Sequence, residues 1–287
     1  MQPQDRKRSI VVAGNCQASF LFRALSQSPE LADAYRVVYC RHLRKGDEGR
    51  IKRKDVLRCA VLIEQIAHDV GDLPFRDELP GDCRTIRFPI LWMNSLWPTL
   101  ARDVRAGPSA PFNGGVYPYG DQLILDLLDQ GLSPEAAGRR WLQTDLREVL
   151  DLDRFHEINA EKYRLLDARA DLKFGADVLA GFARSRLFLT YDHPSLGLLD
   201  HVRRAVFDAL GFAAPGSDLA AISGGMDDIH APVHPSVAEH LGLAWFEPAM
   251  SWRYLDRRFG AEEFMRRYAA MDFGLSGEAS RRLQPAL

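Results

Sequence analysis

The chain has 287 residues, of which 46% are hydrophobic and 26% charged, and its net charge is −2 at pH 7. This composition is typical of a globular protein, and the charge balance gives no reason to expect a nucleic acid or an anionic membrane surface as partner. No apolar run approaches the ~20 residues of a membrane span and no signal-peptide core follows the polar N-terminus, so a cytoplasmic location is expected.

The segment Ser9–Gln17 predicts a first strand, a tight turn and the start of a helix. A β-branched apolar run ends at Gly14, and apolar residues at helical spacing follow it. Gly14 frees the backbone at the turn, and Asn15 suits a helix cap. Cys16 then falls at the helix N-terminus, where the helix dipole favours a thiolate. The alternative is that Cys16 only packs and Gly14 only forms the turn.

Three further strands are expected in the first third of the chain, at Tyr35–Cys40, Ala60–Ile66 and Thr85–Trp92. Pro89 lies within the last of them, which marks it as an edge or irregular strand. Between the first two of these strands, the segment Arg41–Arg58 carries eight Lys/Arg and three Asp/Glu. It is interpreted either as a solvated loop or as a patch that binds phosphate groups.

The middle and end of the chain are mostly helical by pattern. Apolar periodicity and caps predict helices at Tyr119–Gln130, from Ser133-Pro134 through Trp141, and at Leu152–Leu172, Ser195–Leu210, Val237–Leu241 and Ala261–Met271. The segment Arg186–Tyr191 predicts a late strand that ends at Asp192-His193-Pro194. Strands alternating with helices indicate an α/β fold with a mainly parallel, Rossmann-like sheet, flanking helices and helical insertions; the resemblance described below adds an SGNH-like fold as the expectation.

Ligands of open α/β sheets bind beyond the carboxyl ends of the strands. The residues at those predicted ends include a thiol, a carboxylate, carboxamides and an imidazole: Asn15, Cys16, Gln17, Cys40, Arg41, Glu64, Gln65, Trp92, Asn94, Asp192 and His193. Such a set matches a nucleophile, a base and an orienting group. The alternative for His193 is a helix-entry residue bonded to local backbone.

Two other patterns carry little weight. His230 and His234 have the spacing of a helical metal pair, but Pro232 and Pro235 oppose a helix there, so no metal site is predicted. Gly14-Asn15-Cys16-Gln17 lacks the further glycines of a dinucleotide fingerprint. The four cysteines are scattered without a Cys-x-x-Cys pair, which argues against a disulfide scaffold and a structural zinc site.

Taken together, these segments resemble the WcbI-type polysaccharide-biosynthesis acetyltransferases. The resemblance rests on Gly14-Asn15-Cys16-Gln17, Glu64-Gln65-Ile66, Phe88–Trp92, Tyr119–Ala136 and Leu187–Pro194, and it covers roughly residues 9–245. It implies a CoA-dependent acyltransferase that moves acetyl from acetyl-CoA to a sugar hydroxyl of a capsular or surface polysaccharide. The implied partners are acetyl-CoA and a sugar nucleotide or polysaccharide acceptor. The alternatives are an SGNH-like esterase or thioesterase, and a non-catalytic CoA- or nucleotide-binding accessory protein.

The resulting expectation is a single α/β domain over residues 1–287, with a core at about 9–212 and a C-terminal helical segment at 213–287. Cys16 is the expected nucleophile or a neighbour of the thioester, and His193 the general base, oriented by Asp192 or Glu64. Asn15, Gln17 and Asn94 are expected hydrogen-bond donors to the thioester carbonyl. The expected CoA-binding residues are Gly14, Asn15, Gln17, Arg41, Lys52, Arg53 and Lys54, and those for the acceptor are Gln65, Trp92 and Asn94.

Overall fold

The computed structural model describes residues 7–42, 51–68, 71–106 and 117–282. It divides the chain into two compact units. Unit 1 comprises Met1–Leu91, Ala160–Gly181 and His193–Asp227, and unit 2 comprises Trp92–Asn159, Phe182–Asp192 and Asp228–Leu287. This division does not follow the expected boundary at residue 213, because both units are assembled from separate stretches of chain. That the whole chain acts as one domain stays a prediction.

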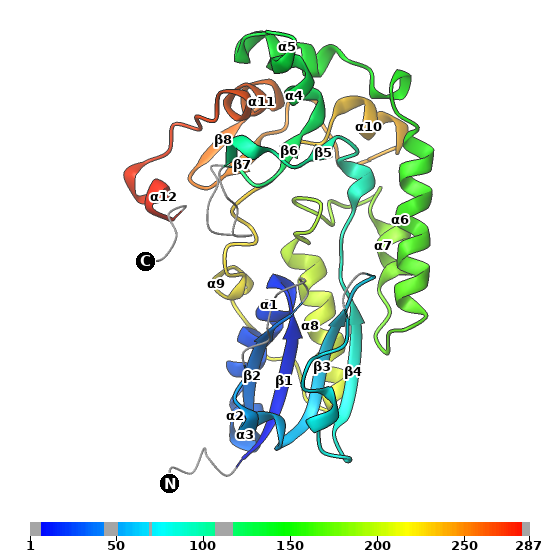
Figure 1. Cartoon of the computed structure of the whole chain (residues 1–287), viewed down its shortest axis with the longest axis vertical. Coiled ribbons are helices and arrows are strands. Elements are labelled where there is room, and N and C mark those ends of the chain that lie inside the picture. The colour runs from blue at the N-terminus through cyan, green and yellow to red at the C-terminus, as the bar shows by residue number, and fades with distance from the viewer. Residues whose placement is uncertain (1–6, 43–50, 69–70, 107–116, 283–287) are drawn as a thin grey trace. The chain divides into compact units, whose positions relative to one another are not determined.

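Unit 1 is built on a four-stranded parallel sheet of order β2-β1-β3-β4 (Figure 1). The strands are β1 (Arg8–Gly14), β2 (Tyr35–Arg41), β3 (Cys59–Ile66) and β4 (Arg84–Pro89). The two central strands are almost continuously apolar and buried, as expected for a parallel sheet covered on both faces. The mainly parallel α/β sheet predicted from the sequence is therefore confirmed, and β4 is an edge strand that ends at Pro89.

Both faces of this sheet are covered. Figure 1 shows α1 (Cys16–Ser26) and α8 (Leu196–Leu210) running along the sheet. A separate apolar cluster joins Val11, Ala13 and Leu62 of the strands to Val56 of α3 (Arg53–Val56) and to Leu73 and Phe75. Unit 1 also holds α2 (Pro29–Ala34), the 3-10 turn η2 (Arg76–Glu78), α7 (Gly175–Gly181) and α9 (Leu219–Ile222).

The direction of α8 places its first turn at the carboxyl edge of the sheet. Ser195 caps the helix by accepting the amide of Leu198 at 3.3 Å, and Gly211 ends it in a left-handed conformation with φ +80°. Near that end, Nη1 of Arg84 at the start of β4 donates to the carbonyl oxygen of Ala209 at 2.8 Å. Since α8 ends at the amino edge of the sheet, it begins at the opposite edge, where β1 runs into α1 (Figure 1).

Unit 2 packs short helices around an aromatic core. Its elements are α4 (Gln122–Asp129), α5 (Pro134–Gln143), α10 (Pro235–His240), α11 (Ala261–Ala270), α12 (Gly277–Arg282) and the two-stranded pairs β5 (Leu100–Ala101) with β6 (Gly120–Asp121) and β7 (Trp252–Tyr254) with β8 (Arg257–Phe259). The 3-10 turns are η3 (Asn94–Leu96), η4 (Val104–Ala106) and η5 (Leu146–Glu148), and α6 (Leu152–Asp167) contributes residues to both units. The rings of Tyr254 and Phe273 stack with centroids 3.7 Å apart. The predicted helices in this region are confirmed, with ends shifted by a few residues.

The predicted strand at Arg186–Tyr191 is wrong. This segment forms no regular strand; it lies in unit 2 and takes no part in the parallel sheet. Its backbone instead meets two separate segments: the amide of Met93 donates to the carbonyl of Tyr191 at 2.7 Å, and the amide of Ala231 donates to that of Leu189 at 2.8 Å. Phe188 and Leu189 are buried here although the segment forms no regular strand.

Among the described residues, no helix combines the length and apolar character that crossing a membrane requires.

Candidate functional site

The turn between β1 and α1 has the conformation that its sequence predicts. Gly14 has φ +154°, and a Cβ placed on it would lie 2.6 Å from Oε1 of Gln65 and 2.7 Å from Cβ of Ala18. Oδ1 of Asn15 accepts the amide of Gln17 at 2.9 Å and caps α1. The hydroxyl of Tyr39 donates to the carbonyls of Gly14 and Asn15 at 2.9 and 3.0 Å. Cys16 is therefore held as the first residue of the helix.

A buried pair of amide side chains fixes this turn to the ends of β3 and β4. The backbone amide of Asn15 donates to Oε1 of Gln65 at 3.0 Å, and Nε2 of Gln65 donates to Oε1 of Gln17 at 2.8 Å. Gln17 also bonds Leu91 twice, through its Oε1 at 3.0 Å and its Nε2 at 2.7 Å. Gln17 and Gln65 are 2% and 1% exposed, so this bridge positions the turn. Their predicted contacts with CoA or acceptor stay predictions.

Cys16 is partly exposed and lies within electrostatic reach of a cation. Arg23 follows it by about two helical turns, donating to Oγ of Ser19 at 2.7 Å and to the carbonyl of Ile222 at 2.6 Å. Burial lowers the pKa of Arg23, while Tyr39 and Cys16 oppose that shift. The guanidinium of Arg23 and the N-terminal end of α1 are therefore two sources of positive potential near Cys16.

Cys16 is expected to react with iodoacetamide at neutral pH faster than the other three cysteines. Cys40 and Cys59 are fully buried, and burial raises the pKa of Cys59 to about 12. Cys83 is partly exposed like Cys16, which makes it the matched control for access. Peptide mass spectrometry of a labelling time course measures each rate. Equal rates at Cys16 and Cys83 would assign Cys16 a packing role only.

Replacing Gly14 by alanine is expected to destabilise the protein by about 3 kcal/mol, because the new Cβ meets Gln65 and Ala18 and the backbone conformation disfavours a side chain. Urea unfolding measures the change. Gly216→Ala is the control, since nothing lies within 4 Å of its added Cβ. A Gly14→Ala protein as stable as the Gly216→Ala protein would contradict the close approach of Gln65.

His193 lies at the same edge of unit 1 as Cys16, although no strand positions it. It is 7% exposed and precedes Pro194 and the cap of α8, whose first turn lies at the carboxyl edge of the sheet. Asp192, its neighbour in the chain, belongs to unit 2 and accepts the hydroxyl of Thr190 at 3.0 Å. The roles of His193 as base and of Asp192 as orienting group stay predictions.

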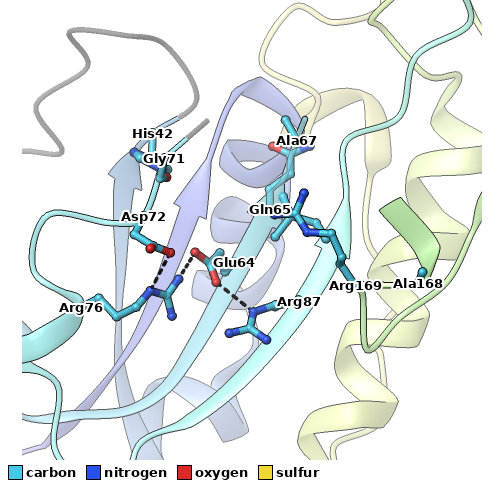
Figure 2. Close-up of a pocket in the computed structure, with 11 residues that line it drawn as sticks. His42, Glu64, Gln65, Ala67, Gly71, Asp72, Arg76, Arg87, Ala168 and Arg169 are labelled. Atoms are coloured by element: carbon cyan, nitrogen blue, oxygen red, sulfur yellow. Dashed lines mark hydrogen bonds and ion pairs between the residues drawn. The ribbon is translucent and has the colours of Figure 1, made fainter. Parts of the chain in front are cut away.

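Glu64 belongs to a charged cluster that the sequence did not indicate. Its side chain is 6% exposed and forms ion pairs with Arg76 and with Arg87, the latter at 3.3 Å. This cluster borders a cavity of about 380 Å³ in unit 1, shown in Figure 2. The expected role of Glu64 in orienting His193 stays a prediction, while its observed role is to hold two guanidinium groups.

The described residues of the basic segment 41–58 lie at both edges of the sheet. Arg41 ends β2 beside Gly14 at the carboxyl edge. Lys52, Arg53 and Lys54 lie at or in α3, next to the amino end of β1: the hydroxyl of Ser9 donates to the carbonyl of Asp55. The structure thus does not bring these three residues to Gly14–Gln17. Residues 43–50 lie outside the described residues.

The remaining predicted residues belong to unit 2. The carbonyl oxygen of Trp92 accepts a hydrogen bond from Nδ2 of Asn159 at 3.3 Å, and Asn94 is the first residue of η3. His234 caps α10, with its Nδ1 accepting the amide of Ser236 at 3.2 Å and its Nε2 2.7 Å from the carbonyl of Trp141. Within the described ranges no group of three or more His, Cys, Asp and Glu side chains is arranged to hold a metal ion.

Comparison with known proteins identifies the family. The family model of the polysaccharide biosynthesis enzyme WcbI matches residues 9–215. A solved structure of WcbI is similar over 97% of this chain and 94% of that one, with a TM-score of 0.68 and 17% sequence identity, a likeness of fold. That structure is of the native protein without a disulfide bond between CoA and one of its cysteines. No curated protein matches the chain. The family model spans more than half of the sequence, and the chain therefore belongs to the WcbI family of polysaccharide biosynthesis enzymes.

Proposed function

We propose that this protein is a CoA-dependent O-acetyltransferase, which moves acetyl from acetyl-CoA to a sugar hydroxyl during synthesis of a capsular or other surface polysaccharide. The observation that carries the proposal is Cys16: a partly exposed thiol at a helix N-terminus, beyond a parallel sheet, with the cation of Arg23 nearby. The solved WcbI structure is of a native protein without a disulfide bond between CoA and one of its cysteines, and this link of CoA with a cysteine supports CoA as the ligand here. The location proposed for the protein is the cytoplasm.

The proposed reaction has two steps. The Cys16 thiolate first adds to the thioester carbonyl of acetyl-CoA, the CoA thiolate leaves, and the acetyl group remains as a thioester on Cys16. His193 then takes the proton of a sugar hydroxyl, the oxygen attacks the acetyl carbonyl, and the Cys16 thiolate leaves. Asp192 is the proposed orienting group for His193, since Glu64 is engaged by Arg76 and Arg87.

Other residues contribute by binding and positioning. Asn15 and Asn94 are the proposed donors to the thioester oxygen as negative charge develops on it. Gly14 lets the chain turn closely there, and Gln17 and Gln65 hold that turn through their shared hydrogen bond. Trp92 is proposed to contact the acceptor, and Arg41, at the carboxyl edge of β2, to contact CoA.

The experiment follows CoA thiol release from acetyl-CoA with and without a glycan acceptor, and detects O-acetyl groups on the glycan by mass spectrometry. An acetyltransferase releases thiol in step with glycan acetylation. Release at the same rate without glycan would identify a hydrolase. Binding of CoA without release under any acceptor would identify an accessory binding protein.

A further inference from the structure

The cavity of unit 1 has a lining suited to an anionic ligand. Its walls come from the end of β3, from β4, and from segments near residues 42, 71–76 and 168–169 (Figure 2). Three guanidinium groups reach it, from Arg76, Arg87 and Arg169, against the two carboxylates of Glu64 and Asp72. The lining therefore carries an excess of positive charge.

The buried carboxylate of Glu64 positions two of these arginines and leaves several of their N–H donors available. It binds Nη2 of Arg76 and Nε of Arg87, and Asp72 lies 3.4 Å from Nε of Arg76. Nη1 of Arg76 and both terminal nitrogens of Arg87 have no partner among the described residues. A guanidinium carries five N–H donors, so each arginine can hold Glu64 and donate to a second anion. Arginine in this arrangement suits phosphate oxygens.

His42 adds an unsatisfied polar atom to the same cavity. His42 is 8% exposed, and its Nε2 lies 3.1 Å from the carbonyl oxygen of Gly71, which requires the proton on Nε2. Nδ1 is then buried with no partner in the described chain. A buried acceptor without a donor is unfavourable. A ligand hydroxyl, such as that of a ribose, would satisfy it.

The cavity adjoins the proposed reaction centre. Gln65 lines it and also accepts the amide of Asn15, the residue before Cys16. His42 donates its backbone amide to the carbonyl of Gly14 at 3.0 Å. Both contacts lie at the carboxyl edge of the sheet, where parallel α/β sheets bind nucleotides.

We infer that this cavity binds the phosphate group of a nucleotide ligand, with Arg76, Arg87 and Arg169 donating to phosphate oxygens, Glu64 positioning the first two, and His42 accepting a sugar hydroxyl. Two sources fit this chemistry: the phosphorylated ribose of CoA and the diphosphate of a sugar nucleotide. The choice of CoA as one of them rests on the proposed function. The phosphate site replaces Lys52–Lys54, which lie at the opposite edge of the sheet.

The test is isothermal titration of CoA, dephospho-CoA, UDP and pantetheine into the wild type and the variants Arg76→Gln, Arg87→Gln and Arg169→Gln. Each substitution removes charge-assisted hydrogen bonds and is therefore expected to lower the affinity for the phosphate-bearing ligand about 10- to 100-fold. Pantetheine, which has no phosphate, should bind all variants equally. Lys7→Gln, with the same loss of charge next to the amino end of β1, should bind every ligand as the wild type does.

The source of the phosphate follows from which ligand is affected. If the variants bind CoA more weakly and UDP with unchanged affinity, the cavity belongs to CoA. The affinity for dephospho-CoA then shows whether the 3′-phosphate is the group bound. If only the affinity for UDP falls, the cavity belongs to the acceptor. Arg169 is exposed and its side chain has no partner in the described structure, so its variant should fold normally and keeps the test valid. Unchanged affinities of CoA and UDP in all three variants would overturn the inference. Weakened CoA binding without any acetyl transfer would overturn the proposed function and leave this cavity standing.

Discussion

Replacing His193 by alanine is expected to lower the turnover of acetyl-CoA with a glycan acceptor by about 10²–10⁴-fold, the range for a positioned general base. The sugar hydroxyl is a weak nucleophile until its proton is taken, and His193 is the proposed acceptor of that proton. Its place before the first turn of α8 puts it at the edge of the sheet where Cys16 begins α1. Steady-state thiol release with saturating glycan measures the loss.

Because His193 is buried, His193→Gln serves as a second variant that keeps the polar shape and cannot take the proton. His201→Ala is the control: it removes a histidine of α8 whose Nε2 lies 3.3 Å from Asp177 on the surface, and it should leave turnover unchanged. Turnover by His193→Gln at the rate of the His201→Ala protein would exclude His193 as the base.

The sheet could be predicted because local sequence and buried position agree along each strand. Ile10–Ala13 and Val61–Ile63 are apolar and mostly β-branched, which suits central strands covered on both faces. Helix ends could also be predicted. Ser133 and Ser195 each accept a hydrogen bond from a backbone amide in the first turn that follows, and Gly211 has the left-handed conformation typical of a helix end. These features depend on residues a few positions apart.

The interactions around the turn could not be predicted, since they join residues far apart in sequence. Gln17 meets Gln65 across 48 positions and Leu91 across 74. Glu64 pairs with Arg76 and Arg87, which lie 12 and 23 positions further along the chain. Only the register of β3 with β4 places Arg87 beside it. A glutamine or arginine in isolation carries no signal for such a partner.

The basic segment shows how charge density in sequence differs from charge density in space. Lys52, Arg53 and Lys54 precede or begin α3, which packs at the amino end of β1, and Arg53 pairs with Glu78 at 2.7 Å. The arginines that line the cavity are scattered over residues 76 to 169 and converge only in the folded unit. The interpretation of residues 41–58 as a phosphate patch stays a prediction, and it relies on proximity along the chain, which a crossover between two strands need not preserve.

Replacing Cys16 by serine is expected to remove nearly all acetyl transfer. In the proposed route Cys16 carries the acetyl group, and a serine without an assisting base is a far weaker nucleophile than a thiolate. If Cys16 only packed beside the thioester during a direct transfer, a hydroxyl would fit the same space and most of the rate would remain. The two routes thus differ at this one substitution, although both need a base such as His193.

Intact-protein mass spectrometry after mixing with acetyl-CoA, without acceptor, reports the intermediate directly. The wild type should gain one acetyl group, and Cys16→Ser none. Cys83→Ser is the matched control, because it removes the other partly exposed thiol and should leave the acetylated species unchanged. Adding glycan should then discharge the acetyl group from the wild-type protein as O-acetyl glycan appears. A wild-type protein that stays unmodified while it acetylates glycan at full rate would exclude the covalent route and leave direct transfer.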